Sequence, residues 1–418
     1  MIARSFLKSS FFVLLAIVFG RGSVVVAGML ISSALGAAAF AAFSFAHVTA
    51  TAASNIAAVG MQNALPRYFA RLQMAGARAE SGSNTLMAIL FAGAGLAVAV
   101  LIILVIPDEL IGVPEPVLYL FLPALLFVVG VKNLFVGAAN GLECFSRVSG
   151  AALMQGAALI VATVVSIGVR SIEVALWGYV LATAIGTAVI VPRISSVLLR
   201  LTRARPYLSL STARNVAQFA GPLFLVTILS NSGIWLSGRT LLGGDEDVFA
   251  FAQFAVGLQW FGLTALASVV VSKAAMPALT RSAVVKNHAI RRQTMIQAVL
   301  LSGGSALLVL LAVLVFPHKI LALYGPELSG ARSALQLFVA AALLASPINI
   351  ISSALIAERR QTSVLVTALL WWSSLMVLLI LLTDRGAAGV AFAVVISYAL
   401  YLGGAIIAGI RHGIFLVR

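Results

Sequence analysis

The sequence has little charge. Of its 418 residues, 27 are basic and 12 acidic, and charged side chains make up 9% of the chain, against roughly a quarter in soluble domains. Hydrophobic residues make up 62%. This composition excludes an ordinary soluble protein, and we predict that lipid surrounds most of the chain.

Residues that hold metals and cofactors are equally scarce. The one cysteine, Cys144, excludes a disulfide framework, a cysteine-rich metal site and an iron–sulfur cluster within one chain. The four histidines are scattered, and no phosphate-binding loop with its lysine is present. We therefore predict no catalytic residues, no metal and no cofactor, and a protein that is not an enzyme.

Long apolar runs, bounded by charges, Pro and Gly, predict an all-α polytopic membrane protein. A membrane-spanning helix needs about 20 apolar residues, and twelve segments qualify. These are 10–34, 37–60, 85–107, 117–139, 149–169, 174–192, 217–241, 248–272, 294–316, 333–357, 364–383 and 387–410.

The basic residues predict the orientation of these spans. With the N-terminus placed in the cytoplasm, twenty Lys and Arg fall on the cytoplasmic side, five fall outside and two lie within spans, whereas nine of the twelve acidic residues fall outside. This bias is the one that sets membrane topology. We predict a multi-pass protein of the bacterial cytoplasmic (inner) membrane with both termini in the cytoplasm. The net charge of +15 then reflects topology and contact with membrane lipids, and no nucleic-acid partner is expected.

An internal repeat predicts two six-helix bundles. A shift of 211 residues places Phe40 on Phe251, Phe43 on Phe254 and Pro66 on Pro277 without a gap. Each half has an even number of spans, so the halves are expected to be related by a pseudo-two-fold axis along the membrane normal, with a central cleft between them. The predicted domains are 1-193 and 217-418, joined by a basic cytoplasmic linker at 194-216.

Two stretches carry a resemblance to a known family. Residues 27–71 (AGMLISSALGAAAFAAFSFAHVTATAASNIAAVGMQNALPRYFAR) and 237–260 (SGRTLLGGDEDVFAFAQFAVGLQW) resemble the polysaccharide transporter family of O-antigen and exopolysaccharide flippases. That family belongs to the multidrug/oligosaccharidyl-lipid/polysaccharide exporter superfamily. One departure is Gly238, where the family often has Asp before the arginine of the seventh helix. The resemblance implies a flippase for lipid-linked oligosaccharide.

Two cations lie within the predicted spans. Arg21 is about 11 residues into the first span, or ~16 Å at 1.5 Å per residue, and is flanked by Gly20 and Gly22. Its guanidinium suits the bidentate binding of a diphosphate, although bonds to carbonyls or Asn side chains of a neighbouring helix are an alternative. Lys132, in the fourth span, is either a second cation of the cleft or a lysine whose stem reaches the membrane surface.

Four further residues complete the candidate site. Asn231 and Ser232 are the repeat partners of Gly20 and Arg21, and either bind sugar hydroxyls or hold Arg21 in place. His47, in the second span, is a candidate for energy coupling or a neutral histidine with one hydrogen-bonded partner. Arg239 lies with Asp245, Glu246 and Asp247 at the outer mouth, as a solvated loop or an exit gate.

These residues favour a transporter that works by alternating access. The leading interpretation is translocation of a polyprenyl-diphosphate-linked oligosaccharide for polysaccharide biosynthesis, with a polymerase or export machinery as a further partner. The first alternative is a multidrug-type exporter of small molecules. Exporters of cations usually need an intramembrane carboxylate, and none of the twelve acids lies within a predicted span. The second alternative is a membrane enzyme of polysaccharide assembly, for which the outer loops are too short.

Overall fold

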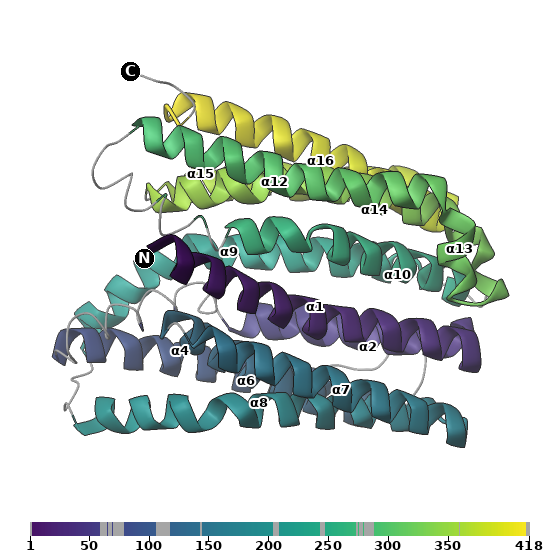
Figure 1. The fold of residues 1–418 in the computed structure, drawn as a ribbon, viewed down its shortest axis with the longest axis horizontal. Helices are drawn as coiled ribbons and strands as arrows, with labels where there is room; N and C mark the ends of the chain where they lie inside the picture. The colour runs from purple at the N-terminus through teal and green to yellow at the C-terminus, as the bar shows by residue number, and fades with distance from the viewer. Residues whose placement is uncertain are drawn as a thin grey trace. The chain divides into compact units, whose positions relative to one another are not determined.

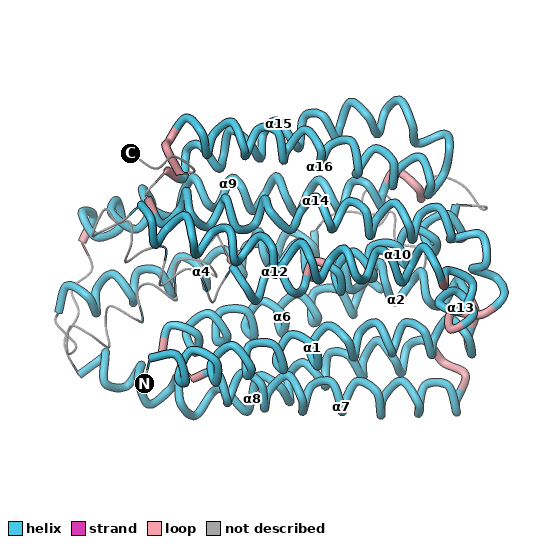
Figure 2. Tube along the Cα trace, turned by 45° about the horizontal axis from the view of Figure 1, so that its top comes forward, coloured by secondary structure: helices cyan, strands magenta, loops and turns pink. Residues whose placement is uncertain are grey.

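Most of the residues that the structure describes are helical. The computed structural model describes residues 2–58, 79–105, 118–142, 144–203, 209–242, 247–272, 288–358 and 360–414, and the single positions 65, 69, 275 and 279. Within these residues no β-strand occurs (Figure 2). The helices labelled in Figure 1 are α1 (Ile2–Leu35), α2 (Ala37–Ala57), α4 (Ala79–Val105), α6 (Leu118–Gly141), α7 (Phe145–Val169), α8 (Ile172–Arg203), α9 (Leu210–Arg239), α10 (Asp247–Thr264), α12 (His288–Val315), α13 (Pro317–Ala322), α14 (Arg332–Ala357), α15 (Gln361–Leu382) and α16 (Gly386–Arg411).

The predicted fold class is confirmed. Among the described residues, eleven segments are long and apolar enough to cross a membrane, and the last of them, Gln361–Arg411, contains both α15 and α16. The 3₁₀ turn η2 (Thr383–Arg385) separates these two helices. Each of the twelve predicted spans therefore corresponds to a helical segment of the structure.

Several helices extend beyond the apolar spans that predicted them. Helix α1 begins at Ile2 rather than near residue 10, and α8 continues through Pro192 to Arg203. Much of the predicted linker at 194-216 is consequently helical, and only 204–208 of it lies outside the described residues. Charged residues mark the end of an apolar span, but the helix continues past them. It can do so because the backbone hydrogen bonds of a helix are internal and persist in water.

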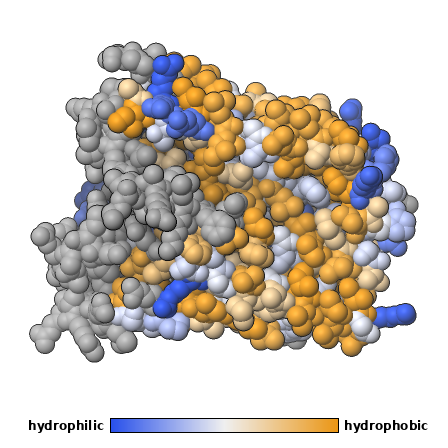
Figure 3. All heavy atoms as spheres, viewed as in Figure 1, coloured by the Kyte–Doolittle hydropathy of each residue, from blue (hydrophilic) through white to orange (hydrophobic). Residues whose placement is uncertain are grey.

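The surfaces of the outer helices are apolar, as expected where lipid replaces water. Apolar side chains cover much of the face drawn in Figure 3. On α12, Leu300 and Leu308 are 69% and 70% exposed, and on α15 Ile380 is 81% exposed. Exposed leucine and isoleucine on this scale would drive aggregation in water, so these faces are suited to contact lipid.

The chain packs into two compact units that cut across the predicted halves. Unit 1 comprises Met1–Ser10, Gly28–Ala41 and Leu236–Arg418, and unit 2 comprises Phe11–Ala27 and Ala42–Trp235. The first two helices and α9 each contribute to both units, because a helix of 21 to 34 residues spans ~30 to 50 Å and meets different neighbours along its length. The division into 1-193 and 217-418 stays a prediction about the sequence repeat.

Small residues let the helices of unit 2 pack closely. A Cβ on Gly156 of α7 would lie 3.0 Å from the Phe19 carbonyl of α1, and a Cβ on Gly20 would lie 3.8 Å from the Ala152 Cβ. Ser149 of α7 also donates a hydrogen bond to the Phe12 carbonyl. Helix α1 is thereby held against α7 along the face that precedes Arg21.

Aromatic side chains form much of the core of unit 1. Phe254 of α10 packs edge-on against Phe338 of α14, with ring centroids 5.2 Å apart, and Phe261 lies 5.5 Å from Tyr398 of α16. Trp371 of α15 packs 5.4 Å from the same tyrosine. Each contact joins two different helices, so this aromatic chain connects α10, α14, α15 and α16.

A second cluster in unit 1 joins the end of α1 to the segment after α13. Ser32 donates a hydrogen bond of 2.6 Å to the Tyr324 carbonyl, and the Tyr324 hydroxyl donates to Gln259 at 2.9 Å. The carboxylate of Glu327 accepts a 2.7 Å bond from the backbone N–H of Ala37, at the first turn of α2. A carboxylate at a helix N-terminus satisfies an unpaired N–H group and is favoured by the helix dipole.

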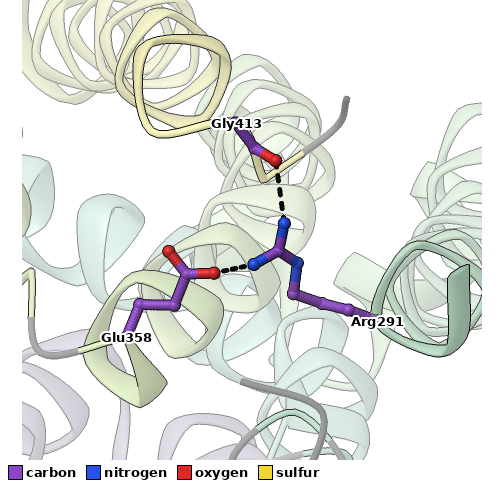
Figure 4. A network of polar contacts seen from close by, with 3 residues as sticks. All are labelled: Arg291, Glu358 and Gly413. Carbon is purple, nitrogen blue, oxygen red and sulfur yellow. Dashed lines mark hydrogen bonds and ion pairs between the residues drawn. The ribbon is translucent and has the colours of Figure 1, made fainter. Parts of the chain in front are cut away.

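An ion pair fastens three helix ends of unit 1 (Figure 4). Arg291, near the start of α12, pairs through Nη1 with Glu358, which follows the last residue of α14. Its Nη2 donates a 2.8 Å bond to the carbonyl of Gly413, just after α16. Arg291 is 5% exposed, so this is a mostly buried, charge-assisted contact. All three residues belong to segments predicted to lie on the cytoplasmic side.

Candidate functional site

The candidate site is built within unit 2. Arg21, Lys132, His47, Asn231 and Ser232 all lie in the segments Phe11–Ala27 and Ala42–Trp235. They come from α1, α2, α6 and α9, so segments far apart in the sequence supply them.

Lys132 is a cation without a direct partner among the described residues. Its side chain extends from α6 and is half-buried. Within the described part of the chain, its ammonium makes no hydrogen bond and no ion pair. Placing a charged side chain at the centre of a membrane span costs about 2.5 to 3.5 kcal/mol on insertion scales, and nothing among these residues offsets that cost by direct pairing.

Arg21 adds a second positive charge to the same region. It is exposed on α1, in the turn that follows the contact of Gly20 with α7. The predicted pair of cations belongs to one unit, with Arg21 on α1 and Lys132 on α6.

Among the described residues, His47 has one hydrogen-bonded partner. Its Nδ1 lies 2.7 Å from the hydroxyl of Tyr179 on α8, and the two rings are 5.7 Å apart. Trp235 of α9 donates a hydrogen bond to Thr49 of the same helix α2, at 3.0 Å. His47 is half-buried, and both readings of this residue, energy coupling and a neutral hydrogen-bonded histidine, stay predictions.

Asn231 belongs to a chain of amides that the sequence analysis missed. Asn133 of α6 donates to the Asn55 Oδ1 at 3.2 Å, and Asn55 of α2 donates to the Asn231 Oδ1 at 3.0 Å. Asn231 in turn donates to the Thr227 carbonyl at 2.8 Å. The signal was available in the sequence, since Asn55 and Asn133 are amides within long apolar runs, and polar groups there are costly unless hydrogen-bonded.

The two remaining residues predicted for the site, Ser232 and Arg239, both lie in α9. Ser232 donates a weak 3.3 Å bond to the Leu229 carbonyl of its own helix. Arg239 ends α9, in unit 1, and donates a 2.7 Å bond to the Leu242 carbonyl. An arginine in that position satisfies a carbonyl at the helix C-terminus. Of the acidic residues predicted beside it, Asp245 and Glu246 lie outside the described residues.

The departure at Gly238 has a steric reason. A Cβ at this position would lie 2.9 Å from the Phe251 Cε2 and 3.0 Å from the Phe254 Cε1. Both phenylalanines are buried, so an aspartate here would force their rings to move. In the first half, a Cβ on Gly28 would likewise lie 2.9 Å from Phe40, the predicted repeat partner of Phe251.

Negative charge is absent from the described surroundings of the cations. Each carboxylate whose side chain is described lies at a helix end or in a connection, at Glu173, Glu327, Glu358 and Asp384. The described residues also contain no group of three or more His, Cys, Asp and Glu that would hold a metal ion. The site is therefore a set of two cations and three linked amides, which is suited to bind an anion with hydrogen-bonding groups.

Comparison with known proteins gives a structural likeness only. No family model matches the chain, and no curated protein matches it. A mutant of the Vibrio cholerae MATE transporter VcmN is similar with a TM-score of 0.74 and 16% identity, over 98% of this chain and 97% of that one. The fold resembles that of the MATE transporters.

Two further structures extend this likeness. An inward-facing multidrug resistance MATE family transporter of the MOP superfamily has a TM-score of 0.71 and 15% identity, over 96% of this chain and 98% of that one. A MOP superfamily transporter from Pyrococcus furiosus, described as having a binding pocket of reverse polarity that suggests a different function, has a TM-score of 0.70 and 15% identity, over 99% and 96%. At this level of identity the similar structures show the fold, and they give no support to the polysaccharide-transporter branch of the superfamily.

Proposed function

We propose that this chain is a membrane transporter that exports an anionic organic molecule by alternating access. The observation that carries the proposal is the ammonium of Lys132, which has no hydrogen bond or ion pair within the described residues although it lies in an apolar span. A bound anion would supply the missing partner. The fold supports transport, because the similar solved structures are those of transporters.

The sign of the charge separates this proposal from export of cationic drugs. A cationic cargo would be repelled by Lys132 and Arg21 and would need a carboxylate to bind. The described carboxylates lie at helix ends and in connections, away from the middle of the spans. One of the similar structures, the transporter from Pyrococcus furiosus, is described as having a binding pocket of reverse polarity. It is a precedent for this fold with a binding pocket of different polarity. In this proposal, a fold similar to that of multidrug transporters carries a site that binds anions.

A lipid-linked oligosaccharide flippase is the second candidate. The specific observation in its favour is that both cations predicted from the sequence, Arg21 and Lys132, belong to unit 2, because a diphosphate carries two adjacent anionic groups. This candidate keeps three predictions made from the sequence. The protein lies in the cytoplasmic membrane, both of its termini are in the cytoplasm, and its cargo is linked to a polyprenyl diphosphate. The similar structures favour the small-molecule exporter over this candidate.

Transport in proteoliposomes tests both candidates. The unmodified protein is compared with Lys132→Met, which keeps the length of the side chain and removes the charge, and with Lys319→Met, a matched control at an exposed lysine that lies over the Phe316 ring. We expect uptake of an anionic dye that Lys132→Met reduces about tenfold or more, while Lys319→Met leaves it unchanged. Uptake of a cationic dye, unaffected by Lys132→Met, would contradict the proposal.

The same vesicles separate the two candidates. Translocation of the headgroup of a polyprenyl-diphosphate-linked sugar is measured alongside uptake of the anionic dye. Export of the dye alone supports the small-molecule exporter, whereas translocation of the headgroup alone supports the flippase. Arg21→Lys keeps the charge and removes the bidentate geometry, so we expect it to impair a diphosphate cargo more than a carboxylate dye.

A further inference from the structure

A cavity lies along one side of helix α12, near the start of the helix. Its volume is about 390 Å³, and among the described residues it is lined by Ala289, Arg292, Gln293, Ile296 and Gln297. The last four follow Ala289 by three, four, seven and eight positions, so all five share one side of the helix. The cavity is therefore lined by a guanidinium and two amides, next to the apolar side chain of Ile296.

Two consecutive arginines lie on different sides of α12, because a helix turns by about 100° per residue. Arg291 is buried and is held by Glu358 and by the Gly413 carbonyl. Arg292 is exposed, and within the described part of the chain it makes no hydrogen bond and no ion pair. The charge of Arg291 is thus compensated inside unit 1, whereas the charge of Arg292 is available at the cavity.

The sequence around the start of α12 carries charge of one sign. Between residues 272 and 297 it contains five basic residues and no Asp or Glu; the basic residues are Lys273, Arg281, Lys286, Arg291 and Arg292. In the predicted topology this segment lies on the cytoplasmic side. An anionic partner is complementary to such a segment, and a cationic partner is repelled by it.

Further along α12, the same side of the helix is apolar. Leu300, Leu301, Leu307 and Leu308 continue the spacing of three and four residues, and all of them are exposed. Gly304 lies between them, and a Cβ at this position would meet no atom within 4 Å. Of the eleven candidate spans among the described residues, the one in α12 is the least buried. This side of the helix is therefore suited to contact hydrocarbon chains, with open space at Gly304.

The polar and apolar parts of this side match the two parts of a phospholipid. The predicted span begins at residue 294, so Arg292 and Gln293 lie at the level of the lipid headgroups, and Gln297 lies ~6 Å further in. The leucines from 300 to 308 then cover ~12 Å of the hydrocarbon region. The polar part is thus placed at the depth of a phosphate and the apolar part at the depth of an acyl chain.

We infer that this side of α12 is a binding site for one anionic phospholipid of the cytoplasmic leaflet. Arg292 donates two parallel hydrogen bonds to the phosphate, as guanidinium groups do, and the amides of Gln293 and Gln297 donate to the remaining oxygens. The acyl chain lies along the leucines and past Gly304. The site belongs to unit 1 and does not depend on the proposed cargo, because the candidate transport residues belong to unit 2.

Native mass spectrometry of the purified full-length protein tests the inference. The protein in detergent is titrated with phosphatidylglycerol or with phosphatidylcholine that carries the same acyl chains, so that the two lipids differ in net charge. We expect the first molecule of phosphatidylglycerol to bind about fivefold more tightly, as expected for one basic residue that contacts an anionic lipid. Equal binding of the two lipids by the unmodified protein would overturn the inference.

Variants of Arg292 locate the preference for the anionic lipid. Arg292→Gln removes the charge and should remove most of the preference, whereas Arg292→Lys keeps the charge without the bidentate geometry and should retain part of it. Arg214→Gln is the matched control, because Arg214 is also exposed, is also the fifth residue of its helix and also lies on the predicted cytoplasmic side. This control should bind both lipids as the unmodified protein does.

A double variant tests the two amides. Gln293→Leu combined with Gln297→Leu keeps Arg292 and removes the amide donors, so it should weaken binding of both lipids about threefold while the preference for phosphatidylglycerol remains, since both lipids contain a phosphate. Unchanged binding of both lipids would overturn the role of the amides. If Arg214→Gln loses as much of the preference as Arg292→Gln, or if Arg292→Gln loses none, the lipid responds to the overall positive charge and the inference is wrong.

Discussion

The ion pair between Arg291 and Glu358 gives the sharpest prediction about stability. Arg291→Met removes the charge and keeps the apolar length of the side chain. It breaks the pair with Glu358 and the bond to the Gly413 carbonyl together. The side chains of the pair are only 6% and 16% exposed, so the substitution leaves a largely buried carboxylate without its partner.

The expected loss follows from this geometry. Removing one partner of a buried pair costs about 3 to 5 kcal/mol, because the other charge is left uncompensated. Unit 1 contains about 200 residues, and in a unit of that size each kcal/mol lowers the melting temperature by roughly 2 to 4 °C. Arg291→Met should therefore lower the melting temperature by on the order of 6 to 20 °C, measured by circular dichroism in detergent.

Two further variants make the reasoning refutable. Glu358→Gln added to Arg291→Met should recover part of the loss, since it removes the uncompensated charge, and the two effects should not add. Arg292→Met is the matched control, because Arg292 is exposed and adjacent. An unchanged melting temperature in Arg291→Met, or a double variant that loses the sum of both single effects, would refute the reasoning.

Two smaller predictions concern packing within one unit. Gly257→Ala in α10 should destabilise the protein by about 1 to 3 kcal/mol, because the added Cβ would lie 3.0 Å from the Ala334 carbonyl. The control is Gly262→Ala in the same helix, whose added Cβ meets no atom within 4 Å. In thermal unfolding this control should be neutral or stabilising. Tyr179→Phe removes the hydroxyl that contacts His47 and should cost about 1 kcal/mol. If backbone hydrogen exchange in both α2 and α8 is the same in Tyr179→Phe as in the unmodified protein, the prediction for Tyr179→Phe is wrong.

The sequence by itself determined the helical membrane fold. Spans can be read from it because every backbone group in lipid must be bonded within its own helix, so about 20 consecutive apolar residues leave few alternatives. The positions of Arg21 and Lys132 within spans were equally visible, because a charge in an apolar run stands out. The helix ends were not, since α1 and α8 continue into polar sequence where charge no longer marks the end of a helix.

Only the tertiary structure decided which residues meet. Asn55, Asn133 and Asn231 are separated by 78 and 176 positions in their two contacts, and no local pattern encodes a hydrogen bond between amides on three helices. The ion pair between Arg291 and Glu358 was likewise visible only in the structure, because pairing depends on which residues the neighbouring helices bring together. Composition fixes the solvent around a membrane protein, whereas the partners of its polar groups depend on how the helices pack.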